Sequence, residues 1–316
     1  MTLIEAVVCG IIQGAAEFLP ISSSGHLALL HAMFGLTDPE SCVTFDVMLH
    51  LATLAAVICV YSNDIFSLIK AIFTMPAKLF TGRAKELSGA ERFALYIIIA
   101  TVPLGFAFFL EDAVTGIAAS PKIIGIVLIL NGFMLLLGDR VGKGNRSSEE
   151  LGAPRALAVG AFQLAAIVPG LSRSGTTITG GLICGLDRGQ AVRFSFIMSV
   201  PAIIGANLVR AVRMVRSPVE SSQLGVYAVG MVFAAVTGFF ALKLLSYIAE
   251  KKKFGIFSIY CFAVGGAAVS FRMFADQPVQ TQGIASGDVA HVGDVLEAAF
   301  YLERADPGLR EVFKTV

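Results

Sequence analysis

Ser23 and His26 lie three positions apart in the stretch EFLPISSSGH, residues 17–26, which also contains the carboxylate of Glu17. At this spacing the imidazole can serve as a general base for the serine hydroxyl or hold it in line for attack. Each serine taken singly more often caps a helix, and His26 alone can act as a cap or make a core hydrogen bond. The convergence of these groups favours chemistry, with Ser23 as the candidate nucleophile.

Glu17 has a partner one helical turn earlier, Gln13, on the same helical face. Their side-chain oxygens can hold a hard divalent cation, Mg²⁺ or Ca²⁺, whose remaining ligands are a substrate phosphate and water. Such a cation would offset the charge of a diphosphate in a site of low dielectric. Glu17 and Gln13 are therefore the candidate metal ligands.

A second polar stretch, PGLSRSGTTITGG at residues 169–181, combines a Pro-Gly turn, Arg173 and several hydroxyl residues. Free backbone amides at a helix N-terminus, together with hydroxyls and a guanidinium, form an anion site suited to phosphate. Charged residues inside a membrane mark a functional site by default. The alternative is that Glu17 and Arg173 form a structural ion pair that locks the two stretches together.

The composition places these groups in a membrane. Of the 316 residues, 56% are hydrophobic and 15% are charged, and the mean hydropathy is +0.78, which lies outside the range of soluble proteins. The net charge of +1 and the scatter of basic residues among short loops exclude nucleic acid as a partner. The five cysteines have no CxxC spacing, so we interpret them as small apolar residues and not as disulfide partners or metal ligands.

Six apolar runs are long enough to cross a bilayer, which takes roughly 17 to 25 residues. They are residues 43–61, 92–110, 122–138, 194–211, 225–248 and 255–274. Shorter or interrupted apolar segments form two pairs, residues 2–36 and 155–187, each hinged on one of the polar stretches. Backbone that leaves a helix at membrane depth must be buried in protein or line a wet cavity. Each pair is therefore predicted to be a re-entrant helical hairpin.

The two hairpins are related in sequence. A shift of 150 positions aligns nine identical residues within the 27 positions 10–36. This indicates an internal duplication with halves at residues 1–150 and 151–275, followed by a polar tail at residues 276–316.

Each half carries one hairpin and three spans, and an odd number of crossings inverts the second half in the membrane. The sequence thus predicts an all-α polytopic membrane protein of two inverted-topology repeats, each one re-entrant helical hairpin plus three transmembrane helices. The polar turns of the two hairpins should meet near the midplane from opposite faces.

Short loops rich in Lys and Arg lie on the cytoplasmic side of membrane proteins, and this rule predicts how the chain is oriented in the membrane. Three basic clusters fall on one side of the predicted topology, so both termini are expected to face outward. The clusters are the loop residues Lys70, Lys78, Arg83 and Lys85; Arg140, Lys143, Arg146 and Arg155; and Lys251, Lys252 and Lys253. Arg210, Arg213 and Arg216 disagree, since they fall on the predicted outer side.

The two copies differ where chemistry is expected. The aligned pairs that differ are Glu17 and Ile167, Ser23 and Arg173, and His26 and Thr176. One copy retains an acid, a candidate nucleophile and an imidazole, and the other gains a cation. A further pair, Asp46 and His50, lies at i and i+4 in a predicted span and predicts either a structural Asp–His hydrogen bond or a role beside the site.

The stretches GIIQGAAEFLPISSSGHL, PGLSRSGTTITGGL and FSFIMSVPAIIGA closely resemble, in this order, the bacterial undecaprenyl-diphosphate phosphatases, also called bacitracin-resistance proteins. The resemblance covers about residues 1–275. It implies removal of the terminal phosphate from the C55 isoprenyl diphosphate carrier, which returns the monophosphate to cell-wall synthesis. It also implies a divalent metal and a site open to the outer face of the bacterial inner membrane.

By motif position the resemblance assigns Glu17 and Gln13 to metal binding or acid chemistry, and it assigns Ser23 and His26 to catalysis. The phosphate-binding residues that it implies are Arg173, Ser172, Ser174, Thr177 and Ser22. Many members of the family carry Glu where this chain has Gln13, which leaves Glu17 as the main anionic ligand. The polar tail after residue 275 is longer than is usual in the family.

We expect a metal-dependent phosphatase in which Ser23 attacks the terminal phosphorus with help from His26, while Arg173 and the metal neutralise the phosphates. His26 itself and a metal-bound water are the alternative nucleophiles. The main alternative function is transport of a polyprenyl-phosphate lipid, because inverted repeats with broken helices are also a transporter architecture. The expected partners are undecaprenyl diphosphate and the bilayer, and a homodimer is a further one.

Overall fold

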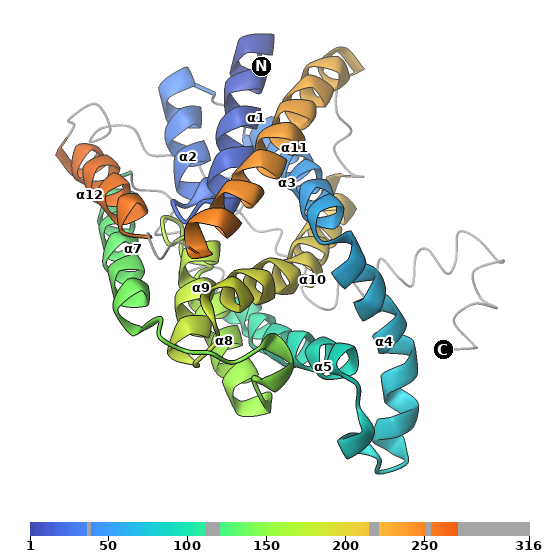
Figure 1. The fold of residues 1–316 in the computed structure, drawn as a ribbon. Coiled ribbons are helices and arrows are strands. Elements are labelled where there is room, and N and C mark those ends of the chain that lie inside the picture. Colours follow the sequence, from blue (N-terminus) through green and yellow to red (C-terminus); the bar gives the residue numbers. More distant parts are fainter. Residues whose placement is uncertain (37–38, 111–120, 215–220, 251–253, 271–316) are drawn as a thin grey trace, which may run out of the picture. The chain divides into compact units, whose positions relative to one another are not determined.

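The long apolar runs of the chain form α-helices. A computed structural model describes residues 1–36, 39–110, 121–214, 221–250 and 254–270. Within these residues, which contain no β-strand, five helical segments are long and apolar enough to cross a membrane, and the chain is an all-α polytopic membrane protein (Figure 1). They are α3 (Pro39–Val60), α5 (Gly89–Thr101) with the 3-10 helix η2 (Val102–Leu110), α7 (Pro121–Val141), α10 (Arg188–Met214) and α11 (Ser221–Glu250).

These five segments coincide with five of the six predicted spans. The sixth, predicted at residues 255–274, begins as α12 (Gly255–Ser270), an apolar helix of 16 residues. The last part of that span, residues 271–274, lies outside the described residues, as does the predicted tail at residues 276–316.

The span predicted at residues 92–110 consists of two helical segments. The α-helix ends at Thr101, and η2 continues to Leu110. Pro103 lies next to the change. Proline has no N–H to donate, so the α-helical hydrogen-bond pattern is interrupted there, although Val102 keeps α-helical backbone angles.

The segment after α3 is a helix, and the interpretation of Lys70 and Lys78 as loop residues is wrong. Both lie on α4 (Ser62–Phe80). Its large exposed apolar side chains are Phe66, Ile69, Ile72, Phe73, Leu79 and Phe80. Asp64, the two lysines and Pro76 interrupt the apolar run, so a search for continuous hydropathy passes over a helix whose apolar residues recur with helical spacing.

Other basic residues predicted to lie in loops also belong to helices. Arg140 lies in the last turn of α7, and Arg155 lies in the first turn of α8 (Ala153–Ala165). Residues 251–253 and Arg216 lie outside the described part of the chain.

Each predicted hairpin is a pair of short helices joined by a polar turn. The first consists of α1 (Leu3–Phe18) and α2 (Ser23–Phe34), and the second of α8 and α9 (Arg173–Ile183). At about 1.5 Å per residue, the 16 residues of α1 span about 24 Å, less than the roughly 30 Å of a hydrocarbon core. The helical pairs are confirmed, while their re-entrant course and the inversion of the repeats stay predictions.

Close glycine contacts join each hairpin to a span of the other half. A Cβ atom on Gly10 of α1 would collide with the carbonyl of Gly230 in α11, and one on Gly160 of α8 would collide with the carbonyl of Ala100 in α5. Small residues allow helices in membranes to approach this closely. Gly10 and Gly160 are matched in the shift of 150 positions, so their equivalent contacts agree with an internal duplication.

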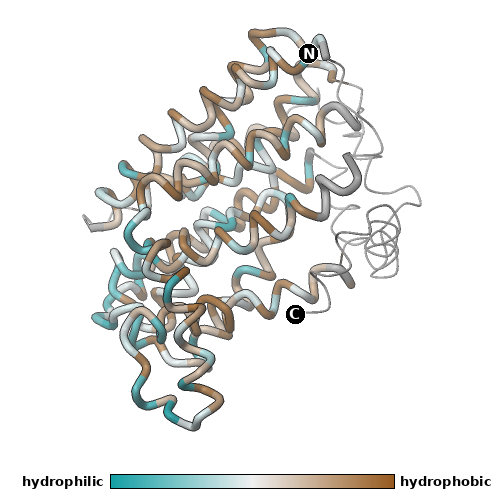
Figure 2. The backbone as a smooth tube through the Cα atoms, turned by 90° about the vertical axis from the view of Figure 1, so that its right-hand side faces the viewer, coloured by the Kyte–Doolittle hydropathy of each residue, from teal (hydrophilic) through white to brown (hydrophobic). Residues whose placement is uncertain are grey.

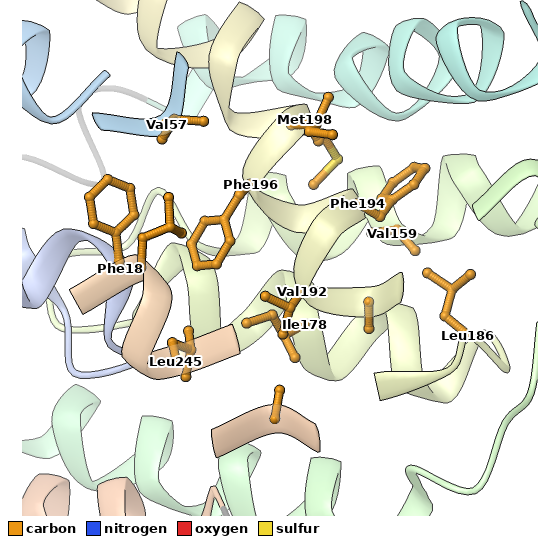
Figure 3. Packing of buried hydrophobic residues seen from close by; sticks show 14 of the residues in the cluster. Phe18, Val57, Val159, Ile178, Leu186, Val192, Phe194, Phe196, Met198 and Leu245 are labelled. Carbon is orange, nitrogen blue, oxygen red and sulfur yellow. The ribbon is translucent and has the colours of Figure 1, made fainter. Parts of the chain in front are cut away.

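The largest cluster of buried apolar side chains surrounds α10 (Figure 3). Phe196 of α10 packs edge to face against Phe18 of α1, with ring centroids 5.5 Å apart. Val57 of α3 and Val159 of α8 belong to the same cluster, which therefore joins both hairpins to the spans. Hydrophobic residues run along most of the helices in Figure 2, whereas hydrophilic residues gather toward one end of them.

Candidate active site

The carboxylate of Glu17 lies where the two hairpins meet. Glu17 stands in the last turn of α1 and is 6% exposed. Gln13 Nε2 donates to Glu17 Oε2 at 3.1 Å, Ser23 Oγ donates to the same oxygen at 2.8 Å, and Arg173 Nη2 donates to Oε1. The prediction that the two polar turns meet is confirmed by this ion pair. In Figure 1, α1 and α2 extend upward from the contact and α8 and α9 extend downward.

The first turn places Ser23 at the start of a helix. Pro20 follows the end of α1, and Ser22, the N-cap of α2, has a φ of 72°. Among the described residues Ser22 is the one non-glycine residue with a positive φ. Its Oγ accepts a hydrogen bond from the N–H of Gly25 at 3.4 Å. Unfavourable backbone of this kind is concentrated at functional sites, where the surrounding structure holds it in place.

The second turn places Arg173 at the equivalent position. Gly170 has a φ of 94°, which glycine adopts without strain, and Ser172 caps α9 by accepting from the N–H of Gly175 at 3.2 Å. Ser23 and Arg173 are therefore both first residues of their helices. The first N–H groups of a helix have no partner within it and carry its positive dipole end, so both helix starts favour an anion.

Asn131 of α7 ties the two turns together. Its Nδ2 donates to the carbonyl of Pro20 at 2.9 Å, and its Oδ1 accepts from the N–H of Ser172 at 3.1 Å. The side chain is completely buried. Sequence reasoning missed this residue, although an amide inside an apolar span is the signal that would have found it.

Both ring nitrogens of His26 contact groups other than Ser23. Nδ1 lies 2.7 Å from the carbonyl of Ser22, which can only accept, so Nδ1 carries a proton. Nε2 lies 2.8 Å from the hydroxyl of Tyr260 in α12, and the two rings stack with centroids 5.6 Å apart. Among the contacts of the described residues, the Ser23 hydroxyl has Glu17 as its partner, so help from His26 stays a prediction.

His50 lies beside Glu17, which the sequence left open. Its Nδ1 lies 2.7 Å from the backbone carbonyl of Asp46, and its Nε2 lies 3.6 Å from Glu17 Oε2. The carboxylate of Asp46 instead has His31 Nε2 3.5 Å away. The i,i+4 pair is therefore joined through the backbone, and the histidine points into the site.

The predicted phosphate-binding hydroxyls are engaged with one another or with the backbone. Ser172 Oγ and Ser174 Oγ lie 3.1 Å apart, and Thr177 Oγ1 donates to the carbonyl of Arg173 at 2.7 Å. Ser22 makes its capping bond to Gly25. In contrast, Arg173 Nη1 is buried and has no hydrogen-bond partner within the described part of the chain. The guanidinium can therefore hold Glu17 and bind a further acceptor at the same time.

A large apolar pocket lies beside the second hairpin. Its volume is about 1130 Å³, and it is lined by residues of α4, α5, η2 and α10 together with Ile167. Ile167 belongs to the turn between α8 and α9, six residues before Arg173. The pocket is thus bounded in part by the same turn that supplies the guanidinium.

Comparison with known proteins identifies the family. The sequence model of the family described as Bacitracin resistance protein BacA matches residues 6–267. The chain belongs to this family. An undecaprenyl-diphosphatase of Thermomicrobium roseum is 40% identical over 273 residues, which cover 84% of this chain and 96% of that protein. An undecaprenyl-diphosphatase of Alkaliphilus metalliredigens is 37% identical over 276 residues, which cover 86% of this chain and all of the relative.

The site residues fit the divalent metal that was expected from the sequence. Gln13 is completely buried, and its Oε1 has no hydrogen-bond partner among the described residues, while its amide nitrogen contacts Glu17. A carboxylate and an amide oxygen suit Mg²⁺ or Ca²⁺. The described residues contain no group of three or more His, Cys, Asp or Glu side chains that could hold a metal, so substrate and water would have to complete the coordination.

Proposed function

We propose that this protein is an undecaprenyl-diphosphate phosphatase. It hydrolyses the C55 isoprenyl diphosphate carrier to undecaprenyl phosphate and inorganic phosphate, which recycles the carrier for cell-wall synthesis and confers bacitracin resistance. Relatives that align over nearly their whole length bear this name. The observation that carries the proposal is the contact of Glu17 with both Ser23 and Arg173, which joins an acid, a hydroxyl and a phosphate-binding cation.

Arg173 binds the terminal phosphate in this account. Its free Nη1 donates to a phosphate oxygen, and the open N–H groups at the starts of α2 and α9 donate to others. When bound, a divalent cation held by Glu17 and Gln13 would offset the charge of the diphosphate. In a site that excludes water these charges act more strongly than they would in bulk solvent.

Ser23 is the nucleophile. Its Oγ forms a bond to the terminal phosphorus, the bond from that phosphorus to the bridging oxygen breaks, and undecaprenyl phosphate leaves. The hydroxyl proton passes along the 2.8 Å hydrogen bond to Glu17 Oε2. Water then hydrolyses the phosphoserine and releases phosphate. Phosphoryl transfer passes through a loose transition state, so positioning and charge matter more than a strong base.

The contacts favour Ser23 over His26 as the nucleophile. To attack phosphorus through Nε2, His26 would first have to give up its hydrogen bond to Tyr260. Its bond to the carbonyl of Ser22 instead makes it a positioning residue, since it holds the turn from which Ser23 projects.

The isoprenyl chain occupies the apolar pocket between α4, α5, η2 and α10. The lining of the pocket is almost wholly aliphatic, and Ile167 connects it to the turn that carries Arg173. A long hydrocarbon chain that leaves this turn can stay in apolar surroundings.

The protein lies in the bacterial inner membrane with its active site open to the outer face. The basic residues on α4, at the end of α7 and in the loop at residues 142–152 support this orientation, because positively charged short segments stay cytoplasmic.

A vesicle experiment separates hydrolysis from transport. Purified protein is reconstituted with labelled C55 diphosphate and Mg²⁺ or Ca²⁺, and both phosphate release and movement of the label between leaflets are measured. The proposal predicts phosphate release that is lost in Arg173→Ala and Glu17→Ala. Movement of intact diphosphate without hydrolysis would establish a transporter instead.

A further inference from the structure

His50 reaches Glu17 from a third helix, α3, and a backbone contact determines which of its ring nitrogens faces the carboxylate. Nδ1 lies 2.7 Å from the carbonyl oxygen of Asp46, so Nδ1 carries the proton and Nε2 of the neutral ring keeps a lone pair. That nitrogen faces Glu17 Oε2 at 3.6 Å, and the side chain is 23% exposed. Histidine ligands of metals are oriented in the same way, by donating their second ring nitrogen to a carbonyl or carboxylate.

The separation of His50 Nε2 and Glu17 Oε2 matches two ligands of one cation. A hydrogen bond from a protonated imidazole to a carboxylate is about 2.7–2.9 Å long, shorter than the observed 3.6 Å. Two ligands bound at roughly 2.1 Å to one ion can lie up to about 4.2 Å apart. The two electron-rich atoms are therefore too far apart for a hydrogen bond and close enough to share a metal.

The amide of Gln13, which contacts Glu17, offers a third ligand. Its Oε1 is buried without a partner within the described residues, and its Nε2 holds the amide against Glu17 Oε2. A buried acceptor without a partner is costly, and a cation would satisfy it. Arg173 donates to Oε1, the other carboxylate oxygen, whereas Oε2 accepts from Gln13 Nε2 and Ser23 Oγ. A half-turn of the Gln13 amide would exchange its nitrogen for its oxygen and so present that oxygen to a cation at Oε2.

We propose that His50 Nε2 is a third protein ligand, with Glu17 and Gln13, of the divalent cation. The inference rests on the proposed function, which supplies the need for a cation. Imidazole nitrogen binds first-row transition metals, so Mn²⁺ can serve as the probe of this site. Oxygens of the substrate phosphate and water take the remaining coordination positions.

The test is electron spin-echo envelope modulation of Mn²⁺ bound to the full-length protein in detergent after removal of other metals. Wild-type protein should show coupling of the manganese electron spin to a directly bound ¹⁴N nucleus. His50→Gln should lose this coupling and raise the Kd for Mn²⁺ roughly 10- to 100-fold, in the range of lost metal-site interactions. The matched control is His31→Gln, which removes the nearby histidine beside Asp46. This variant should keep both the ¹⁴N coupling and the Kd for Mn²⁺ of the wild-type protein.

Three results would overturn the proposal: no binding of Mn²⁺ to the wild-type protein, binding without ¹⁴N coupling, or coupling that persists in His50→Gln. The first two need no variant, so a folding defect cannot hide them. Phosphate release from C55 diphosphate, measured on the same samples, is independent of the spectrum. If phosphate is released but no ¹⁴N coupling is seen, His50 is not a ligand and the phosphatase activity stands. If coupling is seen but no phosphate is released, His50 is a ligand and the proposed phosphatase activity fails.

Discussion

Arg173 donates to Glu17 across the turns of two hairpins whose contacting residues lie 156 positions apart in the chain. Neither residue has an equivalent of its own kind in the other hairpin, since Glu17 aligns with Ile167 and Arg173 with Ser23. The site is therefore assembled from two related hairpins that supply different chemistry. Its function depends on both turns being held in contact.

Replacement of Arg173 by lysine should lower kcat/KM for C55 diphosphate by about 10²-fold or more, the cost of losing a donor to the transition state. Lysine keeps the charge but cannot hold Glu17 and a phosphate oxygen through one planar fork. Phosphate release by purified protein measures the effect. The exposed Arg155, changed to lysine, is the control and should keep full activity. Near-normal turnover of Arg173→Lys would show that the fork is not used.

Ser23→Ala should lower kcat by at least about 10³-fold, because removal of a covalent nucleophile leaves only binding and charge stabilisation. Ser24→Ala changes the neighbouring, exposed hydroxyl and should remain active. Rapid acid quench followed by mass spectrometry should find phosphate on Ser23. Phosphate trapped on His26, or an active Ser23→Ala, would assign the bond to phosphorus to another group.

Asn131→Leu should destabilise the protein, because the N–H of Ser172 loses its partner and the carbonyl of Pro20 keeps only a weak donor, the thiol of Cys261 at 3.8 Å. Each buried group left unpaired costs about 1–3 kcal/mol in the free energy of unfolding. Asn207→Leu is the comparison, since Asn207 is also buried but its Nδ2 has no partner to lose within the described residues. Thermal unfolding, followed by circular dichroism, should give a clearly lower midpoint for Asn131→Leu than for Asn207→Leu. Equal midpoints would argue against a stabilising bridge from Asn131 to the two turns.

Gly205→Leu should fill the apolar pocket, because Gly205 lines it and a Cβ atom there meets nothing within 4 Å. We expect a higher KM for C55 diphosphate and an unchanged KM for the C15 diphosphate, whose short chain needs less of the pocket. Gly225 of α11 has equally open surroundings and lies outside the pocket lining, so Gly225→Leu is the matched control. An equal effect of Gly205→Leu on both substrates would place the chain elsewhere.

The spans, the paired short helices and the meeting of Glu17 with Arg173 follow from the sequence because each depends on a strong local signal. A long apolar run in a membrane protein forms a spanning helix, and a buried carboxylate needs a positively charged side chain as its partner. The helix α4 was missed because its lysines interrupt the apolar run, although its apolar residues keep helical spacing.

Other parts of the site depend on how helices are rotated and packed, which composition does not determine. His50 points at Glu17 instead of bonding to the side chain of Asp46 because of the rotation of α3. Asn131 bridges the two turns from α7, and Tyr260 binds His26 from α12. A single polar residue in an apolar span indicates that a partner exists without indicating which one.

The most direct test of the central claim is phosphate release from C55 diphosphate by wild-type protein and by Glu17→Gln, with the lipid product identified by ³¹P NMR. The account predicts one phosphate and one undecaprenyl phosphate per substrate for the wild type, and at least about a 10²-fold slower reaction for Glu17→Gln, which loses the charge that faces Ser23 and Arg173. Intact diphosphate after incubation with the wild type, or equal rates for the two proteins, would contradict it.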